Sequence, residues 1–257
     1  MPTKIPWCDE VLNVESGCAA CSPGCQNCFA AAFAKRFWKR RRFSDIRIHP
    51  ELLSVPLHWR KPRKILICSM GDLFHPGVPG YFIEQVFDMM LKCPQHTFLV
   101  LTKRIKEAEI VLRLVGEIPN LWIGVSVSTQ KEWNEKIPIL LDTPAPVHFV
   151  SLEPLLEPIF LQPVQDTMGV LAPDWIIIGC ESISGRMGRF NIDPRFDYGK
   201  DFWNAAIDII RQCRNKGVSV FMKQGPVRGK VGHDPKDWPP EARIQQWPEN
   251  PVCKPIT

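Results

Sequence analysis

Residues 96–129 decide the fold, and they read HTFLVLTKRIKEAEIVLRLVGEIPNLWIGVSVST. Residues 96–104 and 121–129 have nearly continuous apolar cores, which is typical of strands covered on both faces of a parallel sheet. Residues 105–116 between them have a helix-like pattern. A strand, a helix and a second strand in this order predict one crossover unit of a parallel sheet.

The same alternation covers nearly the whole chain of 257 residues. No glycine-rich phosphate motif follows the first strand, which disfavours a dinucleotide-binding fold. We therefore predict an α/β fold, a partial or complete (β/α) barrel of parallel strands over residues 1–225. A Pro- and Trp-rich tail, 226–257, is expected to pack on or near it as irregular chain. The other strands are expected at 4–13, 63–70, 147–154, 174–182 and 218–225, and the other helices after Cys28 and at 80–93, 131–143 and 201–217.

The composition is that of a globular protein, with 45% hydrophobic residues and a net charge of +5. This charge alone does not argue for nucleic acid. The first ten residues lack the apolar segment of a secretory signal, and no apolar run approaches the ~18 residues that span a membrane. We expect a cytoplasmic protein with reduced thiols and no membrane partner. Four of its ten cysteines are expected in the core: Cys68, Cys93, Cys180 and Cys213.

Polar side chains follow six successive predicted strands at the points where the strands end. The carboxyl-terminal rim of a barrel is where active sites are built, so these side chains are expected to converge. Carboxylates at such positions can also pair with neighbouring Lys and Arg, because buried charges need partners. The candidate rim residues are Ser69, Asp72, Lys103, Arg104, Ser126, Glu153, Glu181, Lys223 and Gln224.

Four further cysteines lie within eleven residues: Cys18, Cys21, Cys25 and Cys28. Thiolates bind soft metals, and iron–sulfur clusters are held mainly by cysteine. Three cysteine ligands would leave one iron of a 4Fe–4S cluster open to a substrate or cofactor. Two other interpretations remain: a zinc site with four thiolates, and a closed cluster with a structural or electron-transfer role.

The C-x3-C-x2-C spacing of Cys21, Cys25 and Cys28 resembles that of radical S-adenosylmethionine enzymes. The resemblance implies a 4Fe–4S cluster whose open iron chelates S-adenosylmethionine and whose electron yields a 5′-deoxyadenosyl radical. It also implies roles for the rim. Asp72, Ser69, Ser126, Glu153 and Glu181 would bind the cofactor, although Asp72 could instead cap a helix or turn. The catalytic candidates are Lys103, Arg104, Glu153 and Glu181.

A more extensive resemblance covers about residues 3–225. The segments TKIPWCDEVLNVESGC, SPGCQNCFA, PQHTFLVLTKR, PNLWIGVSVSTQ and DWIIIGCESISGRMGR resemble the phage Gp37/Gp68 family, also called DUF5131, which is radical-S-adenosylmethionine-like. The family pattern, C-x6-C-x2-C, selects Cys18, Cys25 and Cys28, so the third ligand is Cys18 or Cys21. The family pattern favours Cys18.

The helix expected after Cys28 carries Phe29, Phe33 and Phe37 every four residues, with Lys and Arg between them. The basic residues could simply form a solvated face, or they could contact phosphates while aromatic rings stack on bases. Nucleic acid is thus the leading candidate substrate. Arg36 and Arg40 of this helix and Lys223 and Gln224 of the rim are the candidate substrate-binding residues.

An electron donor and a partner protein could also be needed. The alternative function is a non-catalytic nucleic-acid-binding protein stabilised by zinc or a closed cluster.

Overall fold

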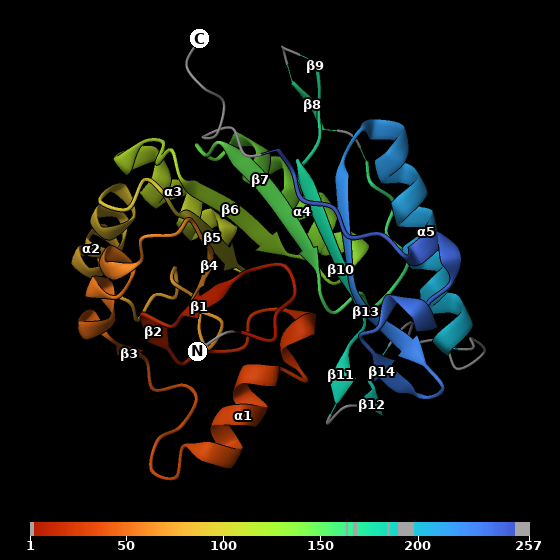
Figure 1. The fold of residues 1–257 in the computed structure, drawn as a ribbon, viewed down its shortest axis with the longest axis horizontal. Helices are drawn as coiled ribbons and strands as arrows, with labels where there is room; N and C mark the ends of the chain where they lie inside the picture. The colour runs from red at the N-terminus through yellow and green to blue at the C-terminus, as the bar shows by residue number, and fades with distance from the viewer. Residues whose placement is uncertain (1–2, 163, 167–168, 184–185, 190–197, 250–257) are drawn as a thin grey trace.

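The computed structural model describes residues 3–249 except 163, 167–168, 184–185 and 190–197. Its centre is a curved sheet of ten strands (Figure 1). Seven neighbouring strands run parallel, in the order β1 (Glu10–Leu12), β4 (Lys64–Ile67), β5 (Thr97–Thr102), β6 (Leu121–Ser126), β7 (Val147–Leu152), β10 (Trp175–Gly179) and β13 (Ser219–Val227). Within the described residues the sheet has two open edges, so the predicted partial (β/α) barrel is confirmed.

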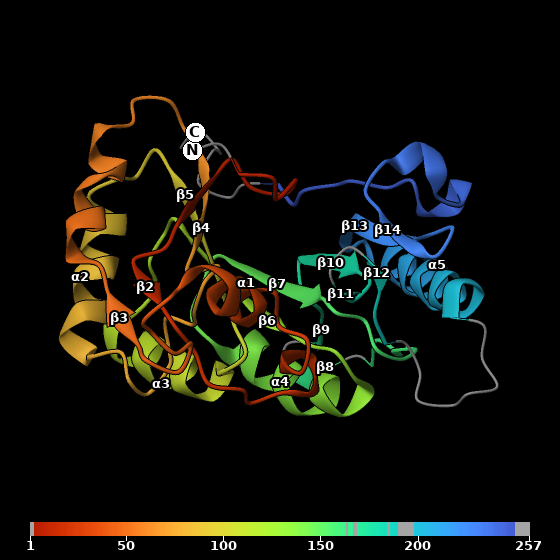
Figure 2. The same cartoon turned by 90° about the horizontal axis from the view of Figure 1, so that it is seen from below.

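Four helices cover the outer side of this sheet (Figures 1 and 2): α2 (Gly80–Leu91), α3 (Ile105–Val115), α4 (Gln130–Asp142) and α5 (Tyr198–Lys216). A fifth helix, α1 (Phe29–Phe37), lies beyond the ends of the strands instead. All five helices and all seven strands occur where the sequence pattern predicted them. The shorter elements are β2 (Glu15–Ser16), β3 (Arg47–Ile48), β8 (Val164–Asp166), β9 (Gly169–Leu171), β11 (Ser182–Ile183), β12 (Arg186–Met187), β14 (Lys230–Gly232) and the 3-10 helices Pro23–Cys25, Pro50–Ser54, Pro56–His58, Pro235–Asp237 and Pro240–Ala242.

The inner face of the sheet is filled by an aromatic cluster. Trp175 of β10 packs against Trp122, Phe149 and Phe221 of neighbouring strands, with ring centroids 5.8 to 6.2 Å apart. Trp7 approaches Trp175 to 6.1 Å and adds to this cluster. These rings lie in the first half of their strands and fill the interior there.

The tail corrects one expectation, because it is not irregular throughout. Strand β13 continues to Val227, and a hairpin through Arg228 and Gly229 leads into the antiparallel strand β14. Both hairpin residues have positive φ, +46° and +77°, which is the geometry of a tight hairpin turn. Arg-Gly is a weaker turn signal than Asn-Gly or Asp-Gly, so this strand was missed.

Later tail residues also bond to the sheet. The backbone N–H of Met222 donates to Ile244 (2.9 Å), and that of Gln246 donates to Val220 (2.8 Å). The ring of Trp247 lies 4.9 Å from that of Phe221. The tail therefore packs along β13 at the same end of the barrel as the aromatic cluster.

Among the residues that the structure describes, no helix is long and apolar enough to cross a membrane.

Candidate functional site

A cavity of about 470 Å³ opens at the carboxyl ends of the parallel strands. This volume is in the range of small-molecule and cofactor sites. Parallel pairing sets side chains from neighbouring strands at the same level, as for Ser126 of β6 and Ser151 of β7. The cavity brings together twelve residues that the sequence predicted for the site: Cys18, Cys21, Cys25, Cys28, Ser69, Asp72, Lys103, Ser126, Glu153, Glu181, Lys223 and Gln224.

The four clustered cysteines form one wall of this cavity. Gly17 turns the chain out of β2 with φ +111°, where a Cβ atom would lie 2.7 Å from the backbone oxygen of Asp45. Cys25 ends a 3-10 turn, and its N–H donates to Ser22 (2.9 Å). Cys28 is the N-cap of α1, so the positive end of this helix dipole adjoins the thiols.

The cysteines differ in acidity. The pKa of Cys25 is lowered to about 5, first by a hydrogen bond from the Cys21 thiol and further by backbone N–H groups and Lys103. The pKa of Cys21 is raised, because its proton is held in that hydrogen bond. Burial raises the pKa of Cys18 to about 11, and Arg104 partly offsets this effect. The lowered pKa of Cys25 favours its thiolate, which is the form that binds metals.

Asp72 joins two strand ends. The side-chain hydroxyl of Thr102 (2.7 Å) and the backbone N–H groups of Lys103 (3.0 Å) and Phe74 (3.1 Å) all donate to its carboxylate. The residue is 5% exposed. These three bonds use most of the acceptor capacity of a carboxylate, so Asp72 fixes the loops after β4 and β5 at the cavity wall.

Two lysines reach the cavity from opposite parts of the sheet. The ammonium of Lys103 donates to the hydroxyl of Ser126. The ammonium of Lys223 lies 2.7 Å from a carboxylate oxygen of Glu153, whose other oxygen accepts a hydrogen bond from Ser151 (3.2 Å). Glu153 is therefore paired with a lysine, which the sequence analysis gave as the alternative to ligand binding. Its side chain still lines the cavity.

Ser69 and Gln224 are each held by a hydrogen bond to a residue far away in the sequence. The hydroxyl of Ser69 donates to the side-chain oxygen of Asn13 (3.1 Å). The amide of Gln224 donates to the backbone oxygen of Cys180 (2.8 Å). Of the four cysteines expected in the core, all are buried, but Cys68 and Cys180 also border the cavity.

The model of a family described as "Protein of unknown function (DUF5131)" matches residues 2–236. The chain belongs to this DUF5131 family. The part of the sequence resemblance that names DUF5131 is thus confirmed, and the phage Gp37/Gp68 name stays a prediction. No curated protein matches the sequence.

Among solved structures, a mutant of spore photoproduct lyase matches this DUF5131 chain with a TM-score of 0.43 and 8% sequence identity. The match covers 86% of this chain, which spans 57% of the length of that protein.

Three candidate residues of the DUF5131 chain do not line the cavity. Arg104 lies beside the cysteines and donates to the backbone oxygen of Ala19 (3.2 Å). Arg36 and Arg40 are exposed on and just after α1. The side chains of Arg36 and Arg40 thus lie on a separate surface. This surface is formed by α1, which starts directly after Cys28.

Arg189 is a site residue that sequence reasoning missed. Its guanidinium donates to both carboxylate oxygens of Glu181 (2.7 and 3.1 Å) and to the backbone oxygen of Pro23 (3.0 Å), and it also bonds Gln26. Burial alone would raise the pKa of Glu181, but hydrogen bonds from Arg189 and Asn27 hold it below its ordinary value. Glu181 and Arg189 together clamp the cysteine wall.

Glu15 is the second missed residue. It is fully buried, and neither of its oxygens has a well-aligned hydrogen bond among the described residues. Burial, with the negative charge of Asp72, raises the pKa of Glu15 to about 8. A Cβ atom at Gly71 would lie 1.9 Å from its carboxylate. The only signal for Glu15 in the sequence is its position, as an acidic residue shortly before the first of the four cysteines.

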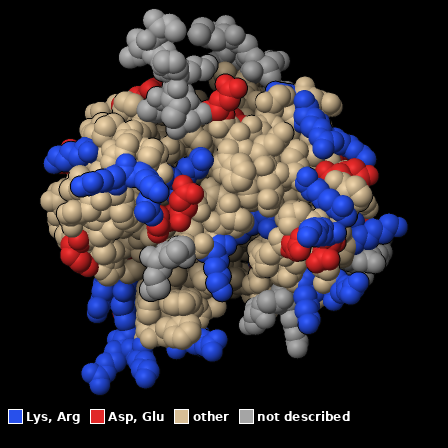
Figure 3. Space-filling view, in the orientation of Figure 1, with Lys and Arg blue, Asp and Glu red and all other residues tan. Residues whose placement is uncertain are grey.

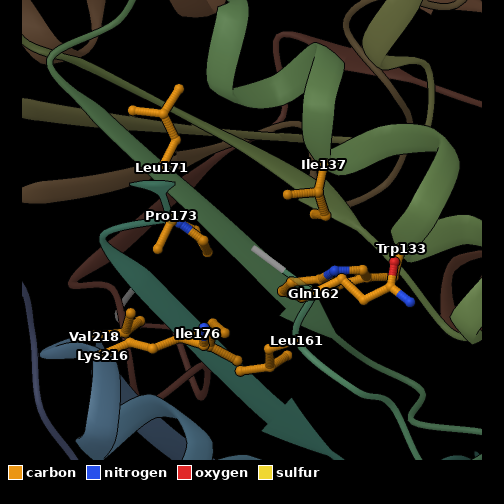
Figure 4. Close-up of a pocket in the computed structure, with 10 residues that line it drawn as sticks. Trp133, Ile137, Leu161, Gln162, Leu171, Pro173, Ile176, Lys216 and Val218 are labelled. Atoms are coloured by element: carbon orange, nitrogen blue, oxygen red, sulfur yellow. The ribbon is translucent and has the colours of Figure 1, made fainter. Parts of the chain in front are cut away.

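A second hollow lies on the outer side of the sheet, away from all these residues (Figure 4). It measures only about 10 Å³, and most of its walls are apolar side chains, such as those of Trp133, Ile137 and Ile176. It lies between α4 and the sheet, and none of the site residues described above lines it.

The cysteine wall can be tested for its fit to a metal group. Within the described ranges, no three His, Cys, Asp or Glu side chains are grouped tightly enough to hold one metal ion. Tetrahedral zinc binds its sulfur ligands about 2.3 Å from one ion. A cubane cluster takes one thiolate at each iron, and the cysteine wall offers four thiols beside a large cavity.

Proposed function

We propose that this protein is a radical S-adenosylmethionine enzyme with a 4Fe–4S cluster at the cysteine wall and S-adenosylmethionine in the adjoining cavity. The observation that carries the proposal is the meeting of the four clustered cysteines with the polar strand ends around one space of about 470 Å³. When bound, the cluster would supply the electron that cleaves S-adenosylmethionine to a 5′-deoxyadenosyl radical.

The cluster would be held by Cys25, Cys28 and one of Cys18 or Cys21. The low pKa of Cys25 supports its role, because a thiolate binds iron without first losing a proton. Cys28 is supported by its position at the positive end of α1. The family spacing favours Cys18 as the third ligand.

The rim residues would bind and orient the cofactor. Lys103 and Lys223 offer ammonium groups to a carboxylate, and Glu153 and Ser126 offer oxygens to ribose hydroxyls or an ammonium group. Arg104 would keep a positive charge beside the thiolates, which stabilises their ionised form. The apolar floor formed by the aromatic cluster would exclude water from one side of the bound ligand.

The test is anaerobic reconstitution with iron and sulfide, followed by EPR of the reduced protein with and without S-adenosylmethionine. We expect a reduced 4Fe–4S signal that shifts when S-adenosylmethionine is added, and 5′-deoxyadenosine after reduction. Absence of iron uptake, or a signal that ignores S-adenosylmethionine, would overturn the proposal. It would leave a structural metal site in a non-catalytic protein.

Single substitutions by Ala separate the ligands by iron content alone. We expect Cys25→Ala and Cys28→Ala to lose most of the bound iron. If the family spacing selects the third ligand, Cys18→Ala should also lose most of the bound iron. Cys21→Ala should then retain the bound iron. Cys213, buried far away in α5, is the control whose replacement should leave the iron content unchanged.

A further inference from the structure

Helix α1 has an unusual orientation, because it buries its alanines and exposes its phenylalanines. Ala30 and Ala34 are 6% and 1% exposed, whereas Phe29, Phe33 and Phe37 are 71%, 40% and 53% exposed. Exposed large apolar side chains that occur singly are ordinary, but a contiguous patch marks an interaction site. This phenylalanine face of α1 therefore has the character of an interaction site.

The three rings form a continuous row that starts at the cavity. Ring centroids are 6.1 Å apart between Phe29 and Phe33 and 4.5 Å apart between Phe33 and Phe37. Phe29 itself lines the cavity next to Cys28. The row thus extends for roughly 10 Å from the cavity mouth, about the length of three stacked nucleotides at 3.4 Å each.

The row is bordered by positive charge. Residues 29–42 contain six Lys and Arg and no Asp or Glu, and Figure 3 shows these basic side chains around the tan surface at the lower end of the molecule. The guanidinium of Arg36 lies 5.2 Å from the ring centre of Phe37. Four of these side chains are exposed without an ion pair among the described residues: Lys35, Arg36, Lys39 and Arg40.

Flat apolar rings among cations match a polyanion with exposed flat groups. Only unpaired bases expose their faces for stacking, since those of a duplex are stacked on each other. Protein–protein interfaces are depleted in lysine, whereas Lys35 and Lys39 border this row. We propose that the phenylalanine face of α1 binds single-stranded nucleic acid, with bases on the rings and phosphates on the flanking Lys and Arg.

The row of phenylalanines would direct a bound nucleic-acid strand toward the cavity. A strand lying on Phe37 and Phe33 reaches Phe29 and the cavity mouth, so its next base could enter the cavity. This inference names the substrate class of the proposed enzyme, and for the reaction on that base it rests on the proposed function. The binding itself does not depend on the cluster and is measured separately.

The test uses fluorescence anisotropy with labelled 20-nucleotide dT and rU strands, on reconstituted protein without oxygen. Phe33→Ala combined with Phe37→Ala should weaken binding by roughly tenfold per ring. The matched control is Ile110→Ala with Leu114→Ala, because these apolar residues of α3 are even more exposed (60% and 83%) than Phe33 and Phe37. The control should bind like the unmodified protein. A duplex of the same length should bind more weakly than either strand.

Charge is tested on the same strands. Arg36→Gln with Arg40→Gln should weaken binding and flatten its salt dependence by about 0.7 in slope for each lost phosphate contact. Equal strand affinity of the phenylalanine variant and the unmodified protein would overturn the inference and assign this face to a protein partner. No strand affinity at all would also overturn it.

The two proposals fail separately. A cluster whose EPR signal responds to S-adenosylmethionine, in a protein that binds no strand, would refute only the nucleic-acid inference. Ring-dependent strand binding in a protein without such a cluster would refute only the enzyme proposal.

Discussion

Replacing Glu15 by Gln should make the protein more stable at alkaline pH. Glu15 is buried, with a pKa raised from 4.5 to about 8. Between these two values the unfolded chain releases the proton and the folded chain keeps it, so the free energy of unfolding falls as pH rises. Below about pH 4.5 both states hold the proton and this loss disappears.

The magnitude follows from the size of the shift. A rise of about 3.5 in pKa corresponds to a ceiling of about 5 kcal/mol at 1.36 kcal/mol per unit. Relaxation and water entry reduce such penalties, so we expect Glu15→Gln to gain about 2 kcal/mol over the unmodified protein at pH 8.5. At pH 4.5 the two proteins should be nearly equal, because Gln resembles the protonated acid.

The measurement is urea unfolding followed by tryptophan fluorescence at several pH values, on cluster-free reduced protein. Glu132→Gln is the matched control of opposite sign. Burial would raise the pKa of Glu132, but Lys136 at 2.6 Å lowers it overall, so this variant should lose stability at neutral pH. Parallel pH curves for the unmodified protein and Glu15→Gln would refute the reasoning about Glu15.

Two further substitutions test the contacts of Glu15 and of Glu181 near the cysteine wall. Gly71→Ala should cost about 1–3 kcal/mol, because its Cβ would meet the Glu15 carboxylate at 1.9 Å; urea unfolding measures the loss, and adding Glu15→Ala should recover most of it. Arg189→Ala should leave buried Glu181 without its cation and cost roughly 1–3 kcal/mol. It should also speed hydrogen exchange in residues 22–28, and unchanged exchange there would show that Arg189 does not hold the wall.

The framework was predictable because its signals are local. A continuous apolar run in the sequence predicts each buried strand. The elements β5, α3 and β6 also follow one another in a single stretch of sequence. Parallel pairing then brings the strand ends together, which is why polar residues as distant as Asp72 and Lys223 could be expected at one rim.

The roles within the site were less predictable, because they depend on contacts between distant segments. The sequence allowed Asp72 to bind a ligand or to fix a turn, and only the bonds from Thr102 and Lys103 reveal its part in the wall. Arg189 and Glu15 had no local pattern that tied them to the site.

Helix α1 illustrates the same limit. Its phenylalanines and alanines both repeat at helical spacing, so the pattern identifies two faces and does not say which is buried. Large apolar side chains usually turn inward, yet here the smaller alanines do so and the phenylalanines face outward. The exposed face is visible only in three dimensions.

The bond between Arg189 and Pro23 spans 166 residues of the chain, and this has a consequence for biosynthesis. At about 5–20 residues per second, a ribosome needs roughly 10–30 s to make the arginine after it has made the proline. During that interval the cysteine segment lacks the clamp that later fixes it. If the cysteines hold the proposed cluster, the segment acquires its final geometry for iron only after Arg189 has been made.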